Sequence, residues 1–188
     1  MTTAPSAYRE SDGSEVTLSD AMAAWAATAR TVLEEVAGNY HDLTNQRDLA
    51  AELHKRSGIT TTATTRSWIG DVLDLVARDC HRRGEPLLSA LCVRADGTIG
   101  DAYGVAMADA YGSPAPADLE LAAAEERLKC YRHFGAKVPP GGGHAVLSPQ
   151  VAVRRRNTAR RLREDTPLPV CPTCHLALPR TGQCDTCS

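Results

Sequence analysis

Two Cys-x-x-Cys pairs near the end of this 188-residue chain limit its fold more than any other feature of the sequence. The first pair is Cys171 and Cys174, the second is Cys184 and Cys187, and nine residues separate them. Four thiolates on two facing knuckles supply the tetrahedral geometry that Zn²⁺ prefers. A unit of about 18 residues cannot fold on apolar burial alone, so the metal would be its core. The spacing predicts a structural zinc ribbon without an open coordination position for catalysis.

Two other chemistries use the same spacing, namely a redox dithiol and an iron centre of the rubredoxin type. Disulfides are disfavoured in the cytoplasm. We expect a cytoplasmic protein, because the first residues lack the pattern of a secretory signal and no run of about 18 apolar residues could span a bilayer. The other cysteines, Cys80, Cys92 and Cys130, fall on predicted apolar faces, which favours small core residues over nucleophiles.

Several segments of the chain have apolar residues at helical spacing, and each lies between residues that favour the start and the end of a helix. Serine, threonine, asparagine or aspartate stands where several of these helices would begin, and glycine where most would end. The chain should therefore be mainly helical. The predicted helices run from Thr17 or Ser19 to about Gly38, from Asn45 to Gly58, from Arg66 to Gly84, from Asp118 to Gly135, and over residues 148–164.

The helix from Asp118 to Gly135 has two distinct sides in this interpretation. Leucine, alanine and aromatic residues line one side, which should close the core. The acidic residues Glu125 and Glu126 fall on the other side, which we expect to face solvent.

The last predicted helix concentrates arginine in a chain whose formal net charge is only −2. A localised basic segment favours one anionic partner over general binding to polyanions. A solvated helix face is the alternative. The arginines expected to contact DNA phosphates are Arg154, Arg155, Arg156, Arg160 and Arg161.

The stretch from Arg66 to Tyr103 changes its period in the middle. An amphipathic helix ends at Gly84, Pro86 follows, and the pattern then alternates as in a β-strand. The Asp-Gly pair at 96–97 is typical of a hairpin turn. A helix followed by a hairpin is the order of a winged helix, so we expect an α+β fold with a winged-helix-like core and a small β-hairpin.

These residues carry a resemblance to the base-flipping half of the alkylguanine-DNA alkyltransferases and their alkyltransferase-like relatives. The family has a leucine-alanine pair, a recognition helix of the form Arg-x-hydrophobic-Gly, a proline that opens a strand, and a glycine-rich turn ending in tyrosine. The matching residues here are Leu49, Ala50, Arg66, Ile69, Gly70, Pro86, Gly97, Ile99, Gly100 and Tyr103.

The family's reactive Pro-Cys-His-Arg motif is missing from this sequence. PLLSALCV stands in its place, and either Ser89 or Leu87 falls on the position of the reactive cysteine, depending on the alignment. This departure argues against direct alkyl transfer. The match covers roughly residues 47–103.

The resemblance implies duplex DNA as the partner and a nucleotide extruded from the base stack. Arg66 matches the arginine that fills the gap. The extruded base would lie between the recognition helix and the strand after Pro86, against Trp68 or Ser89. A carboxylate there could activate water or stabilise positive charge on the sugar, and Glu85 and Asp101 are the candidates.

We therefore expect four segments and one leading function. Residues 1–16 would be a disordered tail, 17–147 a helical, winged-helix-like domain, 148–164 a basic helix, and 165–188 a linker with the zinc ribbon. The function would be to bind DNA and recognise an extruded damaged or modified base, as a DNA glycosylase if the base is excised, in repair or in antiviral defence. The alternatives are a non-enzymatic zinc-ribbon transcription regulator or adaptor, and an RNA-binding accessory factor.

Overall fold

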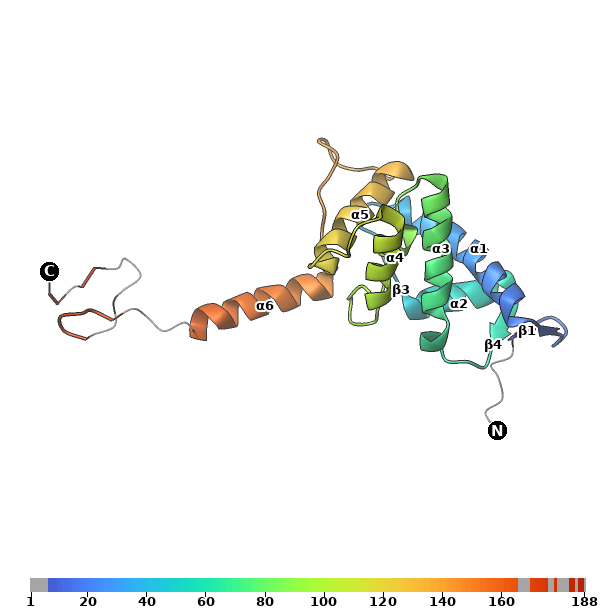
Figure 1. Ribbon diagram of the computed structural model, residues 1–188, viewed down its shortest axis with the longest axis horizontal. Coiled ribbons are helices and arrows are strands. Elements are labelled where there is room, and N and C mark those ends of the chain that lie inside the picture. The colour runs from blue at the N-terminus through green and yellow to red at the C-terminus, as the bar shows by residue number, and fades with distance from the viewer. Residues whose placement is uncertain (1–6, 166–169, 176–177, 179–182, 185, 188) are drawn as a thin grey trace. The chain divides into compact units, whose positions relative to one another are not determined.

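A computed structural model describes residues 7–165, 170–175, 178, 183–184 and 186–187 (Figure 1). The chain forms two compact units, Met1–Val151 and Ala152–Ser188. In the described part of the chain, no helix is both long and apolar enough to cross a membrane.

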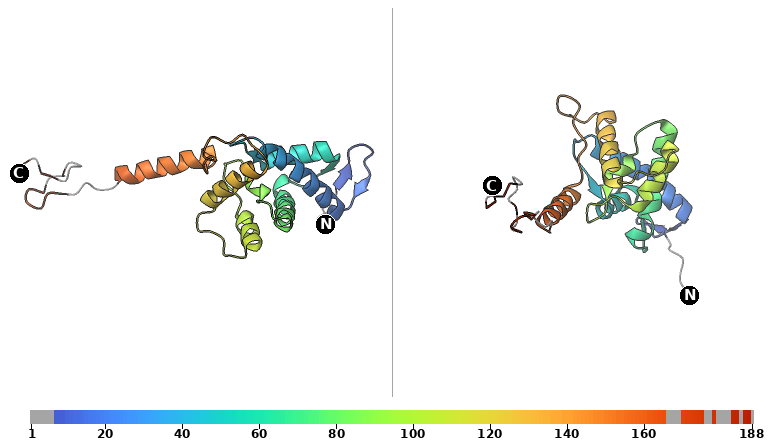
Figure 2. Two further views of the ribbon diagram at one scale, coloured as in Figure 1. Left: turned by 90° about the horizontal axis from the view of Figure 1, so that it is seen from above. Right: turned by 60° about the vertical axis from the view of Figure 1, so that its left-hand side comes forward.

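Three helices of the first unit begin and end close to the predicted signals (Figures 1 and 2). The Thr17 hydroxyl accepts a hydrogen bond from the Asp20 amide at 3.1 Å, and the Asn45 side chain accepts from two amides of the next turn at 3.0 Å. Such bonds satisfy backbone donors that have no partner within the helix. The helices are α1 (Leu18–Ala37), α2 (Gln46–Ser57) and α3 (Ile69–Arg83).

Three further helices follow, and one of them, α4, is not among the helices predicted from the sequence. The Asp118 carboxylate caps the next helix by accepting from the Leu121 amide at 3.1 Å, and the Ser148 hydroxyl accepts from the Val151 amide at 3.4 Å. Both predicted starts are confirmed. The helices are α4 (Asp101–Tyr111), α5 (Leu119–His133) and α6 (Pro149–Asp165).

The prediction of a disordered N-terminal tail is wrong for residues 7–16, while residues 1–6 lie outside the described part. Strands β1 (Ala7–Arg9) and β2 (Glu15–Val16) form an antiparallel hairpin, and β1 also pairs with β4 (Ile59–Thr61). Ala7 is fully buried and Val16 is 8% exposed. Apolar burial and pairing with the β-branched segment after α2 order this stretch.

The prediction of a β-hairpin after Pro86 is also wrong. The chain forms a short 3₁₀ turn, η2 (Leu88–Leu91), whose four residues are all buried. Strand β5 (Cys92–Val93) then pairs in parallel with β3 (Thr44–Asn45). A tight turn does form at the Asp-Gly pair, with the Arg94 amide donating to the Thr98 carbonyl at 2.8 Å. The chain continues into α4 instead of a return strand, so the winged-helix arrangement is not confirmed.

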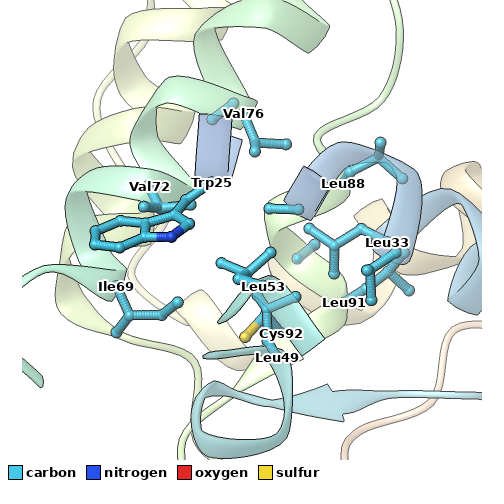
Figure 3. Packing of buried hydrophobic residues seen from close by; sticks show 14 of the residues in the cluster. Trp25, Leu33, Leu49, Leu53, Ile69, Val72, Val76, Leu88, Leu91 and Cys92 are labelled. Carbon is cyan, nitrogen blue, oxygen red and sulfur yellow. The ribbon is translucent and has the colours of Figure 1, made fainter. Parts of the chain in front are cut away.

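The core lies where α1 packs against α2 and α3. Figure 3 shows Trp25 among Leu53, Ile69 and Val72, which come from α2 and α3. Trp25 is completely buried, and its indole N–H donates to the Ile59 carbonyl at 3.0 Å. This bond satisfies the one polar atom of the ring and ties α1 to β4.

Helix α5 buries two charged residues, contrary to the prediction that Glu126 faces solvent. Glu126 is 0% exposed and Arg127 is 2% exposed. One Glu126 oxygen accepts from the Leu87 amide at 2.8 Å and from the Tyr111 hydroxyl at 2.5 Å, and the other accepts from the Lys129 ammonium at 2.8 Å. Both oxygens of this buried carboxylate therefore accept hydrogen bonds from residues of the first unit.

Replacing Glu126 with alanine should destabilise the protein strongly, because the Leu87 amide would remain buried without an acceptor. We expect a loss of about 3 kcal/mol in the free energy of unfolding. The exposed neighbour Glu125 is the matched control, and its replacement with alanine should change stability by less than about 0.5 kcal/mol. Urea denaturation of both variants checks this, and equal losses would contradict the structural role of Glu126.

Candidate functional site

The four cysteines of the second unit gather as the spacing predicts. Their sulfur atoms all lie within 4.8 Å of one another, and the Cys174 and Cys184 sulfurs are 3.5 Å apart. Cys171 is buried and Cys187 is exposed. A group of four thiols this close could hold a metal ion in tetrahedral coordination.

Backbone amides prepare two of these thiols for metal binding. Hydrogen bonds from the amides of Cys174 and Thr173 lower the pKa of Cys171 to about 6, and the Thr186 amide lowers the pKa of Cys184. The pKa of Cys187 is raised to about 11, chiefly by its hydrogen bond with Cys174. Because the thiolate is the metal ligand, these lowered pKa values reduce the cost of deprotonating Cys171 and Cys184 when a metal binds.

Native mass spectrometry of the full chain should show one metal ion, with an added mass that identifies it. Replacing both Cys171 and Cys184 with serine should remove the ion, since two of the four sulfur ligands are lost. His175 follows the first knuckle with a φ of 58° but is not part of the cluster. His175→Asn, which tolerates this backbone conformation, should keep the metal. Metal retained by the double serine variant would refute the assignment.

The arginines predicted to contact phosphates are exposed on α6. The Arg160 guanidinium lies 3.6 Å from the Glu164 carboxylate, and both side chains are more than half exposed. An exposed pair of this kind contributes little to stability. The predicted set is Arg154, Arg155, Arg156, Arg160 and Arg161.

Arg66 and Trp68, the two residues predicted at the start of the recognition helix, lie in different environments. Arg66 is exposed in the 3₁₀ turn η1 (Thr65–Ser67), just before α3. Trp68 is only 4% exposed, and its ring centroid lies 4.5 Å from that of Trp25. Its large apolar ring is part of the core, and Trp68 is not among the residues that line the two cavities described below.

The two predicted catalytic carboxylates lie at different places. Glu85 accepts from the Arg30 guanidinium at 2.5 Å, and its side chain is 18% exposed. It lines an open cavity of about 600 Å³ together with His81, Tyr111 and Lys129. The Asp101 side chain is 94% exposed and lies 3.3 Å from the Arg94 guanidinium. The structure does not bring Glu85 and Asp101 together.

Ser89 lines a different cavity, of about 310 Å³, between α3 and α4. Figures 1 and 2 show these two helices side by side, and they pack against each other. The sequence predicts a pocket between this recognition helix and the chain after Pro86. The structure adds a wall made by α4, which no pattern in the sequence predicts. The residues that line this cavity include Gly70, Asp71, Leu73, Asp74, Arg78, Ser89, Cys92, Ile99, Tyr103, Ala106 and Asp109.

The cavity has a buried inner part and a charged rim. Ser89 is 5% exposed and Tyr103 is 6% exposed, and neither hydroxyl has a hydrogen-bond partner among the described residues. Burial raises the pKa of Tyr103, so its hydroxyl stays neutral. Burial also raises the pKa of Cys92 to about 12, which leaves an unreactive thiol, as expected for a core cysteine.

The rim carries three carboxylates and one cation. Asp71 and Asp109 are exposed, while Asp74 is half-buried and lies 2.7 Å from the Arg78 guanidinium. Aspartates on a helix surface gave no signal in the sequence, because their meeting depends on the packing of α3 against α4. The rim therefore favours a ligand that presents N–H donors.

Comparison with family models, with curated proteins and with solved structures gives no match to this chain.

Proposed function

We propose that this protein binds duplex DNA and recognises a damaged or modified base extruded from the helix. The observation that carries the proposal is the set of exposed arginines on α6, in a chain whose net charge is −2. Guanidinium groups match the geometry of phosphate oxygens. Contacts to phosphates fix a protein on DNA without reading its sequence, so the base must be recognised elsewhere.

The cysteine cluster would support this function by stabilising the second unit. We infer that the metal is zinc, because four thiolates without an open position are typical of structural zinc sites. We infer that the protein is cytoplasmic, because thiolate ligands stay reduced in that compartment. Zinc would supply folding energy to the second unit and take no part in chemistry.

The base would be recognised in the cavity between α3 and α4. Excision of the base, in repair or in antiviral defence, would need a carboxylate beside the sugar. Glu85 and Asp101 do not line this cavity. Excision would therefore have to use one of the rim carboxylates, Asp71, Asp74 or Asp109, and strand scission after alkali on duplexes with modified bases measures it directly.

Replacing Arg155, Arg156 and Arg160 with alanine should weaken binding similarly on all DNA sequences. Each lost phosphate contact should reduce the slope of log K against log salt by about 0.9. The same three residues replaced with lysine keep the charge and form the matched control, which should retain most of the slope. Fluorescence anisotropy over a range of salt concentrations measures both. An unchanged affinity and slope in the alanine variant would leave these arginines as a solvated face.

Arg66→Ala tests whether a side chain fills the gap left by the base. We expect about a tenfold loss of affinity for a duplex with a modified base, and a much smaller loss for a duplex with an abasic gap. Lys55, an exposed cation on α2, is the control, because its replacement should affect both duplexes alike. Equal losses from Arg66→Ala on both duplexes, without cleavage by the unmutated protein, would favour the regulator or adaptor.

A further inference from the structure

We propose that the exposed face formed by α1 and α3 is a contact surface for a second copy of this chain, with the two α3 helices packed antiparallel about a two-fold axis. Such a dimer would form without DNA, so it is independent of the proposed function. Three features of the face support it: an apolar groove between the two helices, a row of small uncharged residues on α1, and charges on α3 that complement themselves when the helix is reversed.

The groove lies between α1 and α3, which pack against each other (Figure 1), and has a volume of about 520 Å³. Met22, Ala26 and Val76 contribute apolar surface to it, and Leu75 is 39% exposed beside them. A single exposed leucine is ordinary, but a continuous apolar groove between two helices is the shape that receives another helix.

The outward positions of α1 carry no charge over three turns. Ser19, Ala23, Ala27 and Thr31 follow one another at four-residue spacing and are all exposed. The solvent face of a helix normally carries charged or strongly polar side chains. The distance between two packed helices depends on the side chains at their contact, so small residues here leave room for a helix of the partner to lie close.

The charges of α3 decide which partner fits the groove. Asp71 is in the first turn and Arg82 in the last, with Leu75 and Arg78 between them on the same exposed face. When a second α3 lies antiparallel, Asp71 of each copy falls opposite Arg82 of the other. Leu75 then falls opposite Arg78, whose aliphatic stem can cover it. The face of α3 is therefore complementary to itself in this direction.

Other partners fit this face less well. An acidic helix would be attracted by Arg78 and Arg82 but repelled by Asp71 and Asp74, and a basic helix would meet the opposite problem. A two-fold axis forms each favourable contact twice. Within one chain, Arg78 and Arg82 already lie 2.7 Å from Asp74 and 2.6 Å from Asp79. Their guanidinium groups are 69% and 73% exposed and have five N–H donors each, enough for a second carboxylate.

Sedimentation velocity of the full chain, in reducing buffer and without DNA, tests the proposal. We expect a monomer–dimer equilibrium that moves toward the dimer as the protein is concentrated to a few hundred micromolar. Added salt should move it back toward the monomer, because salt screens exposed charges. A chain that stays monomeric over this range would overturn the proposal.

Charge reversal identifies the contact face. Asp71→Arg places arginine opposite Arg82 at both symmetric contacts, and Arg82→Asp places aspartate opposite Asp71, so each variant alone should dimerise about tenfold more weakly or worse. An equal mixture of the two variants restores opposite charges at both contacts and should form heterodimers. This rescue separates a lost contact from misfolding. Dimers that resist either reversal, or that the mixture does not restore, would overturn the proposal.

Leu75→Glu tests the apolar part of the surface. It should abolish the dimer, because two carboxylates would be removed from water at the contact. Leu121 on α5 is the matched control, since it is 48% exposed, and Leu121→Glu should dimerise normally. Neither change removes a buried side chain, so both variants should keep the melting temperature of the unmutated chain. Equal dimerisation by the two variants would refute the assignment of this face.

Discussion

The buried carboxylate of Glu126 is the interaction on which the arrangement of the first unit depends. It accepts from the Leu87 amide, just before η2, and from the Tyr111 hydroxyl, at the end of α4. The next residue, Arg127, donates to the Ala90 carbonyl at 2.8 Å within η2. Two adjacent charged residues of α5 thus hold η2 and the end of α4 in place, with Ser89 between the two anchored backbone positions. Since Ser89 and α4 form parts of the cavity, its shape follows from these bonds.

The two units reach stability by different physical means. In the first, apolar side chains around Trp25 remove surface from water, and both oxygens of the buried Glu126 carboxylate accept hydrogen bonds. In the second, four sulfur atoms lie close enough to share one metal ion. In the proposed function, the exposed arginines of α6 provide affinity, and the cavity in the first unit provides recognition. Affinity for phosphates and discrimination between bases would therefore arise from different chemistry in different units.

Local signals in the sequence predicted what depends on local interactions. Asn45, Gly84 and Asp118 begin or end helices as expected, because a cap is formed within one turn of the chain. The spacing of the cysteines likewise predicted their cluster. The alternating pattern after Pro86 predicted a hairpin that does not form. The residues of η2 are all buried, and Cys92 of β5 pairs with Thr44, which lies 48 residues earlier in the chain. The burial of Glu126 and Trp68, and the meeting of Ser89 with the rim of Asp74 and Asp109, depend on tertiary contacts that no local pattern contains.

Hydrogen–deuterium exchange of the full chain on duplex DNA tests the central claim most directly, because it reports the phosphate contacts and the base cavity in one measurement. Two duplexes would be compared, one fully paired and one with a single unpaired modified base, which needs no energy for unpairing. The account predicts slower exchange in α6 on both duplexes, and slower exchange around Gly70, Ser89 and Tyr103 only on the second. Exchange in α6 that is unchanged by either duplex, or equal exchange at the cavity on both, would contradict it.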